Sequence, residues 1–360
     1  MRRGTGVEAQ QPEPRNTVRI PSLDGLRAIA VTAVIIAHVL SNRVYLGNWE
    51  FQFSESLGFL GVDLFFVISG FIITVLLLQE KERLGRISLP RFYARRALRL
   101  WPPLWVFMAV VVLLGSENEV AIHLKGVIAP LLFISDYVID HHSVVTTHTW
   151  SLSVEEQFYL LWPIFVVRFL NGRLRRILVV AILAAPAVRI ASYVLIPEWR
   201  TAAFFQFHVR YDMLAAGCLL ALCKDDPRAQ RLFRRRPAVL ACLCGLLALS
   251  VNGIDAGLSS RTFLFTVGYG IQAICLAILV GVCISVPPIR LGRFLNSASL
   301  THVGRISYAL YLWQQLFIVT PFPPFRFLPL GIAGAVACAE ISWHAIEKPM
   351  QKWRTALHPR

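Results

Sequence analysis

The chain has 360 residues, of which 56% are hydrophobic and 16% charged, and its formal net charge is +15. This composition is too apolar for a soluble globular protein of that length. Several windows approach 20 residues with few charges, which is the length that a helix needs to cross about 30 Å of hydrocarbon. The sequence therefore predicts an all-α polytopic membrane protein whose basic loops face the cytoplasm, and it gives no reason to expect a nucleic-acid partner.

Apolar stretches predict about ten transmembrane helices. They lie at residues 21–42, 58–79, 98–115, 151–170, 176–195, 208–223, 237–254, 262–285, 305–320 and 328–346. Lys and Arg gather in alternate connections, at 80–97, 171–175, 224–236 and 286–304 and at both ends of the chain. Because loops rich in Lys and Arg stay in the cytoplasm, we expect both termini there. Residues 1–18 are expected to be a disordered cytoplasmic lead, 19–350 the membrane domain and 351–360 a cytoplasmic tail.

The connection at 116–150 contains a further apolar run, GVIAPLLFISDYVI, at 126–139. This run is too short to cross the bilayer comfortably, and counting it as a span places the later arginine-rich loops outside. We expect it to be an external interfacial or re-entrant segment.

The first span contains a histidine. Asp24 and Arg27 mark its cytoplasmic end, and His38 follows Asp24 by 14 residues, or about 21 Å along a helix. His38 is therefore expected in the outer half of the membrane, where an ionisable side chain indicates function. Imidazole is suited to take a proton near neutral pH. The alternative is a neutral histidine that bonds a backbone carbonyl.

The second span combines a carboxylate with spaced glycines. Asp63 enters it from the outer side, where it either orients a histidine, binds a polar acceptor or faces the positive end of the helix dipole. Gly58, Gly61 and Gly70 are expected to permit a close approach of neighbouring helices.

The third span begins with clustered arginines in RFYARRALRLWPPLW, residues 91–105. Arg95 and Arg99 are four residues apart and are expected to share a helix face, with Arg96 beside them. Guanidinium groups bind phosphate in bidentate fashion, so the cluster suits a polyanion. Acidic lipid headgroups are the alternative ligand.

Two adjacent glutamates, Glu155 and Glu156, lie in HTWSLSVEEQFYLLWP, residues 148–163. We expect them near the outer face, at the membrane level of His38 and Asp63, as part of an acid/base and hydroxyl-binding site. The alternative is a helix N-terminus capped by Ser151, which accounts for one glutamate better than for two.

Later spans add polar candidates for the same chamber. Arg210 and Asp212 begin the sixth span and are expected to pair with each other or with the glutamates. Tyr311 and Gln314 lie on the ninth span, where they are expected to line a passage.

Three histidines, His141, His142 and His148, lie in one predicted external loop. Their spacing matches no metal motif, so we expect no metal site and interpret them as solvated loop residues.

Taken together and in order, five segments resemble one family. SLDGLRAIAVTAVIIAHV, GFLGVDLFFVISGFIIT, FYARRALRLWP, TWSLSVEEQFYLLWP and ISYALYLWQ are similar to motifs of the acyltransferase-3 family of integral membrane acyltransferases. The likeness covers about residues 19–350, which it identifies as a membrane acyltransferase domain. The family commonly carries His after the LYLW motif, and this chain has Gln314 there, so a second proton-shuttling role at that position is in doubt.

The resemblance implies transfer of an acyl group, acetyl or another short one, from acyl-CoA to a hydroxyl of a sugar-containing acceptor in the cytoplasmic membrane. It implies that His38 is the catalytic histidine, that Glu155 matches the acidic motif, and that acyl-CoA is a substrate with no permanently bound cofactor. From their positions we expect His38 to act as the base, with Asp63 or Glu155 orienting the histidine or the acceptor. The expected donor site comprises Arg27, Arg95, Arg96 and Arg99. The expected acceptor site comprises Glu156, Arg210, Tyr311 and Gln314. A transporter of sugars or organic anions is the alternative, and the sequence leaves the oligomeric state open.

Overall fold

The computed structural model describes residues 20, 22–43, 48–116, 123–138, 143–170, 172–200, 204–258, 263–285, 288–319 and 327–357. The predicted lead at 1–18, His141 and His142 lie outside these ranges. Within them the regular structure is entirely helical, as predicted. The long helices are α1 (Leu23–Arg43), α2 (Asn48–Leu84), α3 (Leu89–Ser116), α5 (Thr149–Phe169), α6 (Leu174–Leu195), α7 (Phe207–Cys223), α9 (Pro237–Leu258), α10 (Tyr269–Ser285), α12 (Ala298–Ile318) and α13 (Leu328–Ser342). Short helices are α4 (Leu124–Leu131), α8 (Pro227–Arg234), α11 (Ile289–Leu295) and α14 (Lys348–Ala356).

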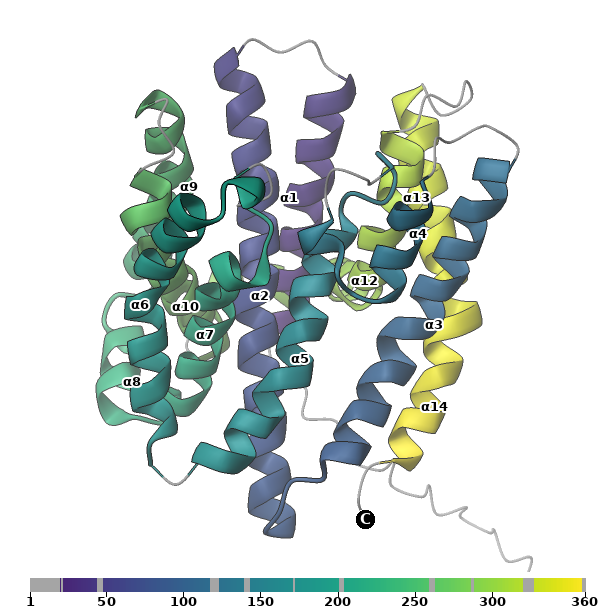
Figure 1. Ribbon diagram of the computed structural model, residues 1–360. Helices are drawn as coiled ribbons and strands as arrows, with labels where there is room; N and C mark the ends of the chain where they lie inside the picture. Colours follow the sequence, from purple (N-terminus) through teal and green to yellow (C-terminus); the bar gives the residue numbers. More distant parts are fainter. Residues whose placement is uncertain are drawn as a thin grey trace, which may run out of the picture.

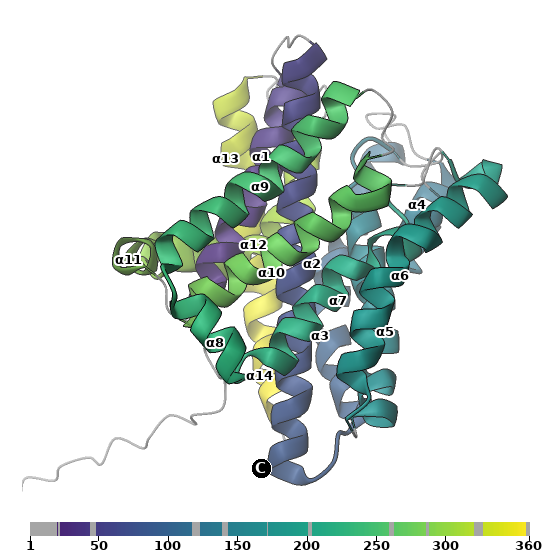
Figure 2. The ribbon, with the colours of Figure 1, turned by 90° about the vertical axis from the view of Figure 1, so that its left-hand side faces the viewer.

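Helix α2 is the centre of the bundle. It contacts α1, α5, α7, α9 and α10, and Figure 1 shows it upright between a group formed by α6, α7, α9 and α10 and a group formed by α3, α13 and α14. In the turned view, α9 and α10 cross α2 obliquely (Figure 2). Helix α12 packs against both α1 and α13, and residues of α1, α2, α3, α5 and α12 surround one space.

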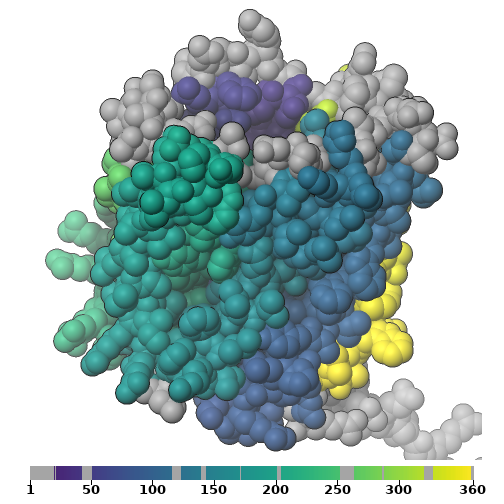
Figure 3. All heavy atoms as spheres, viewed as in Figure 1, coloured from purple at the N-terminus to yellow at the C-terminus, as the bar shows by residue number. Residues whose placement is uncertain are grey.

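Six helices of the described chain are long and apolar enough to cross a membrane on their own. They are Leu23–Asn42, Phe51–Leu84, Leu89–Gly115, Leu174–Leu195, Leu264–Ser285 and Leu328–Ala356. Their lipid-facing residues are apolar and exposed, for example Leu113 on α3 and Leu183 and Leu195 on α6, and α3 and α6 belong to the broad face seen in Figure 3. The protein is therefore a multi-pass membrane protein. The count of ten spans and the side of the termini stay predictions.

The helices that contain the second and third predicted spans are longer than the apolar segments from which those spans were predicted. Helix α2 has 37 residues, about 55 Å at 1.5 Å per residue, and α3 begins at Leu89 rather than near 98. Hydropathy detects the part of a helix that lies in hydrocarbon, but backbone hydrogen bonding continues the helix into water. As a consequence, the arginines of 91–99 lie on a rigid helix rather than in a loop.

The apolar run at 126–139 forms no span. It contains the eight-residue helix α4 and the 3₁₀ turn Ser135–Tyr137. Asp136 in this turn accepts hydrogen bonds from Gln157 Nε2 at 2.8 Å and from the Phe207 backbone N–H at 3.1 Å. Burial raises the pKa of the Asp136 carboxyl to about 7. These contacts fix the segment against the beginnings of α5 and α7.

Glycines allow the close helix contacts that the sequence predicts. A Cβ on Gly70 of α2 would overlap the carbonyl oxygen of Leu214 on α7, and one on Gly217 of α7 would overlap the carbonyl oxygen of Val67. Gly61 approaches the carbonyl oxygen of Ala30 on α1 in the same way. The prediction of close approach is confirmed.

We predict that Gly70→Ala lowers the melting temperature of the purified protein, because the new methyl group forces α2 and α7 apart. Overpacking of this kind typically costs about 1–3 kcal/mol. The matched control is Gly245→Ala on α9, where a Cβ meets nothing within 4 Å and helix propensity favours Ala. Thermal unfolding in detergent measures both, and equal melting temperatures for the two variants would contradict the packing argument.

Candidate functional site

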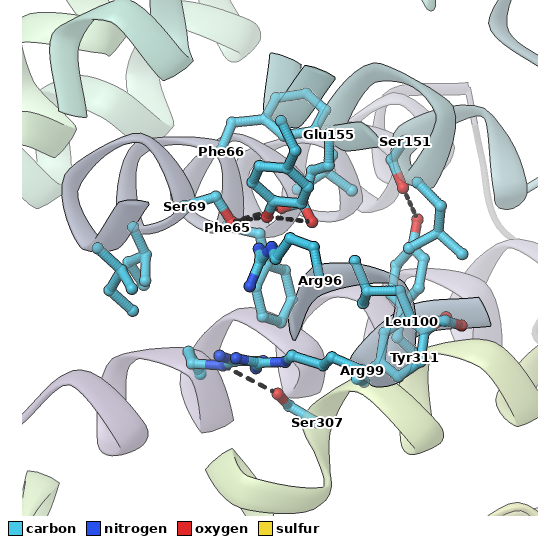
Figure 4. Close-up of a pocket in the computed structure, with 17 residues that line it drawn as sticks. Phe65, Phe66, Ser69, Arg96, Arg99, Leu100, Ser151, Glu155, Ser307 and Tyr311 are labelled. Carbon is cyan, nitrogen blue, oxygen red and sulfur yellow. Dashed lines mark hydrogen bonds between the residues drawn. The ribbon is translucent and has the colours of Figure 1, made fainter. Parts of the chain in front are cut away.

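A pocket with both apolar and polar walls lies between α1, α2, α3, α5 and α12, and its empty space, open solvent included, is about 670 Å³. Figure 4 shows Arg96 and Arg99 reaching into it from α3, opposite Ser69 and Glu155 on one side and Ser307 on the other. Its walls are Arg27, Val62, Phe65, Phe66, Ile68, Ser69, Ile72, Arg96, Arg99, Leu100, Ser151, Leu152, Glu155, Tyr159, Ser307, Tyr308 and Tyr311.

Three arginines form the cationic wall of this pocket. The Arg27 Nε donates to Ser307 Oγ at 3.2 Å, and the Arg96 guanidinium lies 3.8 Å above the centre of the Tyr159 ring. Arg99 lies close enough to Arg27 and Arg96 for their charges to repel. Positive charges that converge in a pocket stabilise a bound anion, and planar guanidinium groups suit phosphate.

Arg95 is not part of this wall, although the sequence predicted that it shares a face with Arg99. It forms an ion pair with Glu80 of α2 at 2.7 Å and donates to the carbonyl oxygen of Leu357 at 3.4 Å. Arg96 and Arg99 are three residues apart and occupy the inner face instead. Arg95 therefore ties the beginning of α3 to the end of α2 and to the chain after α14.

Glu155 lies in the arginine-lined pocket. Ser69 Oγ donates to its Oε1 at 2.7 Å, and the Tyr159 hydroxyl donates to its Oε2 at 3.0 Å. Glu156 turns away from these partners and faces Arg96 and Trp101. The side chains of Glu155 and Glu156 thus lie in different surroundings. Neither contacts Asp63, and the expected cluster of both glutamates with Asp63 is not formed.

His38 is held by two consecutive glutamines of α12. Its Nδ1 lies 2.9 Å from Gln314 Oε1, and its Nε2 lies 3.3 Å from Gln315 Nε2. Gln315 Oε1 in turn lies 2.8 Å from Nδ1 of His148. His148 is only 2% exposed, so its interpretation as a solvated loop residue is wrong.

Sequence reasoning missed His148 and Gln315 as members of this group. Each had a signal: His148 immediately precedes the TWSLSVEEQFY motif, and Gln315 follows Gln314. Within the described chain no group of three or more His, Cys, Asp or Glu side chains is placed to hold a metal ion.

A line of polar side chains joins the pocket to His38. Tyr311 lines the pocket, and its hydroxyl lies 2.6 Å from Ser151 Oγ and donates to the carbonyl oxygen of His148 at 3.1 Å. Gln314 and Gln315 follow Tyr311 by about one turn of α12, which places them on the same side of the helix. Along α1, the eleven positions from Arg27 to His38 correspond to about 16 Å. The arginine wall and the histidine are therefore two ends of one polar path.

Asp63 and Arg210 form a buried ion pair with each other, away from His38. Both side chains are fully buried, and the Arg210 guanidinium lies 4.4 Å from the centre of the Tyr269 ring. A second buried pair joins Arg189 of α6 to Asp212. The sequence predicted that Arg210 pairs with Asp212 or with the glutamates. It pairs with Asp63 of α2 instead. These pairs link α2, α6, α7 and α10.

The fold and the site together are those of a multi-pass helical membrane protein in which an arginine-lined pocket is connected to a histidine. Residues 20–341 match the acyltransferase domain of the acyltransferase-3 family, and the chain belongs to that family. The resemblance in its motifs is thereby confirmed.

Curated relatives carry names that describe O-acetylation. The chain is 29% identical over 359 residues to the peptidoglycan O-acetyltransferase OatA of Listeria monocytogenes, covering 92% of this chain and 56% of that protein. It is 31% identical over 368 residues to the O-acetyltransferase OatA of Staphylococcus aureus, covering 92% and 57%. It is 30% identical over 365 residues to the putative peptidoglycan O-acetyltransferase YrhL of Bacillus subtilis, covering 92% and 55%. The chain thus spans a little over half the length of these relatives. No solved structure matches.

We predict that Asp63→Leu strongly destabilises the protein, because Arg210 is left as an uncompensated buried charge. Breaking a buried pair in this way typically costs about 3–5 kcal/mol. The double variant Asp63→Leu with Arg210→Met removes both charges and is expected to recover most of the melting temperature.

The double variant also tests the catalytic role predicted for Asp63. Wild-type activity in the double variant assigns Asp63 to structure. A stable but inactive double variant would show that the pair of Asp63 and Arg210 is needed for activity as well as for stability.

Proposed function

We propose that this protein is a membrane O-acyltransferase that moves an acetyl or other short acyl group from acyl-CoA to a hydroxyl of a sugar-containing acceptor. One observation carries the proposal: a pocket walled by arginines is joined by hydrogen-bonded polar side chains to a histidine in the neighbouring part of the bundle. Membership of the acyltransferase family and the names of the O-acetyltransferase relatives support it.

The arginine wall is the proposed donor site. Arg27, Arg96 and Arg99 present cationic groups to one space, and CoA carries phosphates that such groups bind. Phe65 and Phe66 form an apolar side of the same pocket, which suits the uncharged pantetheine arm. Arg96 rests on Tyr159, and Tyr159 bonds Glu155, so the proposed task of Glu155 is to hold this wall in place.

His38 is the proposed general base. It takes the proton of the acceptor hydroxyl, the hydroxyl oxygen attacks the thioester carbon, and the carbon–sulfur bond breaks. The departing CoA thiolate then takes the proton back from the imidazole, so the histidine ends the reaction neutral. Proton transfer of this kind typically contributes about 10²–10⁴-fold to a rate.

The proposed topology gives the two ends of the polar path different surroundings. Both termini and the arginine wall lie on the cytoplasmic side of the cytoplasmic membrane, where acyl-CoA is available. His38 lies deeper in the membrane, toward the acceptor. The relatives named for peptidoglycan make a peptidoglycan sugar the first acceptor to test.

We predict that Arg96→Gln and Arg99→Gln each raise the KM for acetyl-CoA by about tenfold or more, since a hydrogen bond to a charged group contributes about 1.5–3 kcal/mol. The control is Arg175→Gln, which changes a half-exposed arginine paired with Asp226. Steady-state kinetics of the purified protein measure all three. An unchanged donor KM in both pocket variants would refute the donor site and favour transport without acyl-CoA.

We predict that His38→Ala abolishes acyl transfer while binding of acetyl-CoA survives, because the arginine wall lies about 16 Å from it along α1. Transfer of radiolabelled acetyl groups to candidate sugars measures the first effect, and equilibrium binding of labelled acetyl-CoA measures the second. Wild-type turnover in the variant would remove His38 from the mechanism.

A further inference from the structure

Both ring nitrogens of His38 face a glutamine side chain. Nδ1 faces Gln314 Oε1 at 2.9 Å, and Nε2 faces Gln315 Nε2 at 3.3 Å. Gln314 is fully buried, and among the described residues His38 is its hydrogen-bond partner while its own amide nitrogen has none. A buried glutamine whose oxygen serves one imidazole indicates a role in holding that ring.

His148 fixes which way the Gln315 amide points. Its backbone N–H donates to Gln315 Oε1 at 3.4 Å, and its Nδ1 lies 2.8 Å from the same oxygen. A backbone N–H can only donate, so the atom that it faces must be the amide oxygen. The NH₂ group of Gln315 is therefore the end that faces His38.

The hydrogen-bonding chemistry then sets the tautomer of His38. The Gln315 NH₂ group only donates, so Nε2 of His38 must carry the lone pair. The ring proton is consequently on Nδ1, where the Gln314 oxygen accepts it. Both contacts require the same tautomer, and each glutamine supports the assignment that the other makes.

We propose that Gln314 is a positioning residue that holds neutral His38 as the Nδ1–H tautomer, so that Nε2 is the atom that takes the proton of the acceptor hydroxyl. The proposal rests on the proposed function, in which His38 is the base. His148 holds the Gln315 amide, and the Gln315 NH₂ group lies on the side to which Nε2 points. The 3.3 Å contact between Gln315 Nε2 and His38 Nε2 is long enough for an acceptor hydroxyl to replace it. When Nε2 gains the proton, Nδ1–H stays bonded to Gln314, and the Nε2 proton later passes to the CoA thiolate.

The resemblance led us to expect histidine after the LYLW motif, and this role gives glutamine a function at that position. An amide oxygen accepts the Nδ1 proton at any pH near neutrality, and it never becomes a donor by protonation. Gln314 therefore orients His38 without exchanging protons with it.

The experiment is ¹⁵N NMR of the intact protein, labelled at histidine, in nanodiscs. Nitrogen shifts distinguish a protonated ring nitrogen from one with a lone pair, and His38→Ala identifies the His38 signals among the nine histidines. We expect neutral His38 as Nδ1–H in the wild type. We expect a shift toward Nε2–H in Gln314→Met, which keeps side-chain length but leaves only the long 3.3 Å contact with Gln315 to favour Nδ1–H. Gln314→Glu keeps an acceptor oxygen and is expected to keep the wild-type tautomer.

Kinetics of the same variants provide the second readout. We expect Gln314→Met to lower kcat about tenfold, as the loss of one hydrogen bond to the base implies, with the KM for acetyl-CoA unchanged. Gln314→Glu is expected to retain more turnover than Gln314→Met. The matched control is Gln272→Met on α10, an identical change at another fully buried glutamine, for which we expect kcat within twofold of the wild type.

The outcomes separate this proposal from the one on which it rests. An Nε2–H wild-type histidine, or a tautomer unchanged in Gln314→Met, overturns the positioning role even if His38→Ala is inactive. Full turnover by His38→Ala overturns the proposed function, and the positioning role with it. Equal losses of kcat in Gln314→Met and Gln272→Met show a general effect of removing a buried amide and overturn the specific role.

Discussion

Hydrocarbon offers no hydrogen-bond partners, and this constraint governs the buried charges of the bundle. Several of them are therefore bonded to a residue from a different helix. Asp63 of α2 pairs with Arg210 of α7, and Glu155 of α5 bonds Ser69 of α2. Such contacts hold the helices in one arrangement, because sliding or rotating any of them leaves a charge without its partner. The same arrangement that satisfies the charges also shapes the pocket.

The sequence predicted the parts of the structure that depend on one helix at a time. Apolar length gave the positions of the long helices, and the short run at 126–139 was correctly distinguished from a span. Small residues also carried a local signal, since Gly61 and Gly70 lie where backbones touch. The extent of α2 was underestimated because residues 48–57 and 80–84, which are more polar, continue the helix beyond both ends of the apolar window. Family motifs supplied the histidine and the arginine cluster.

Contacts between side chains of different helices could not be predicted from the sequence in the same way. Asp63 and Arg210 are 147 positions apart, and their pairing depends on how each helix is rotated about its axis. Hydropathy gives the approximate depth of a residue but not its lateral neighbours. Glu155 therefore looked like a companion of Asp63, whereas rotation of α5 directs it to Ser69 and Tyr159. The separation of Arg95 from Arg96 has the same cause, since adjacent residues on a helix point in different directions.

The polar face of α12 is the feature that joins the two halves of the proposed reaction. Ser307 contacts Arg27, Tyr311 lines the pocket and contacts Ser151, and Gln314 and Gln315 contact His38. Ser307, Tyr311 and then Gln314 and Gln315 follow one another at intervals of three or four, so they form one stripe along α12. A polar stripe inside a membrane bundle is costly unless its members are bonded, and each of these is bonded to another residue of the path. In the proposed reaction the donor lies along this stripe, with its phosphates at the arginine wall and its thioester toward His38. The stripe then explains why a cationic pocket and a base about 16 Å apart along α1 belong to one site.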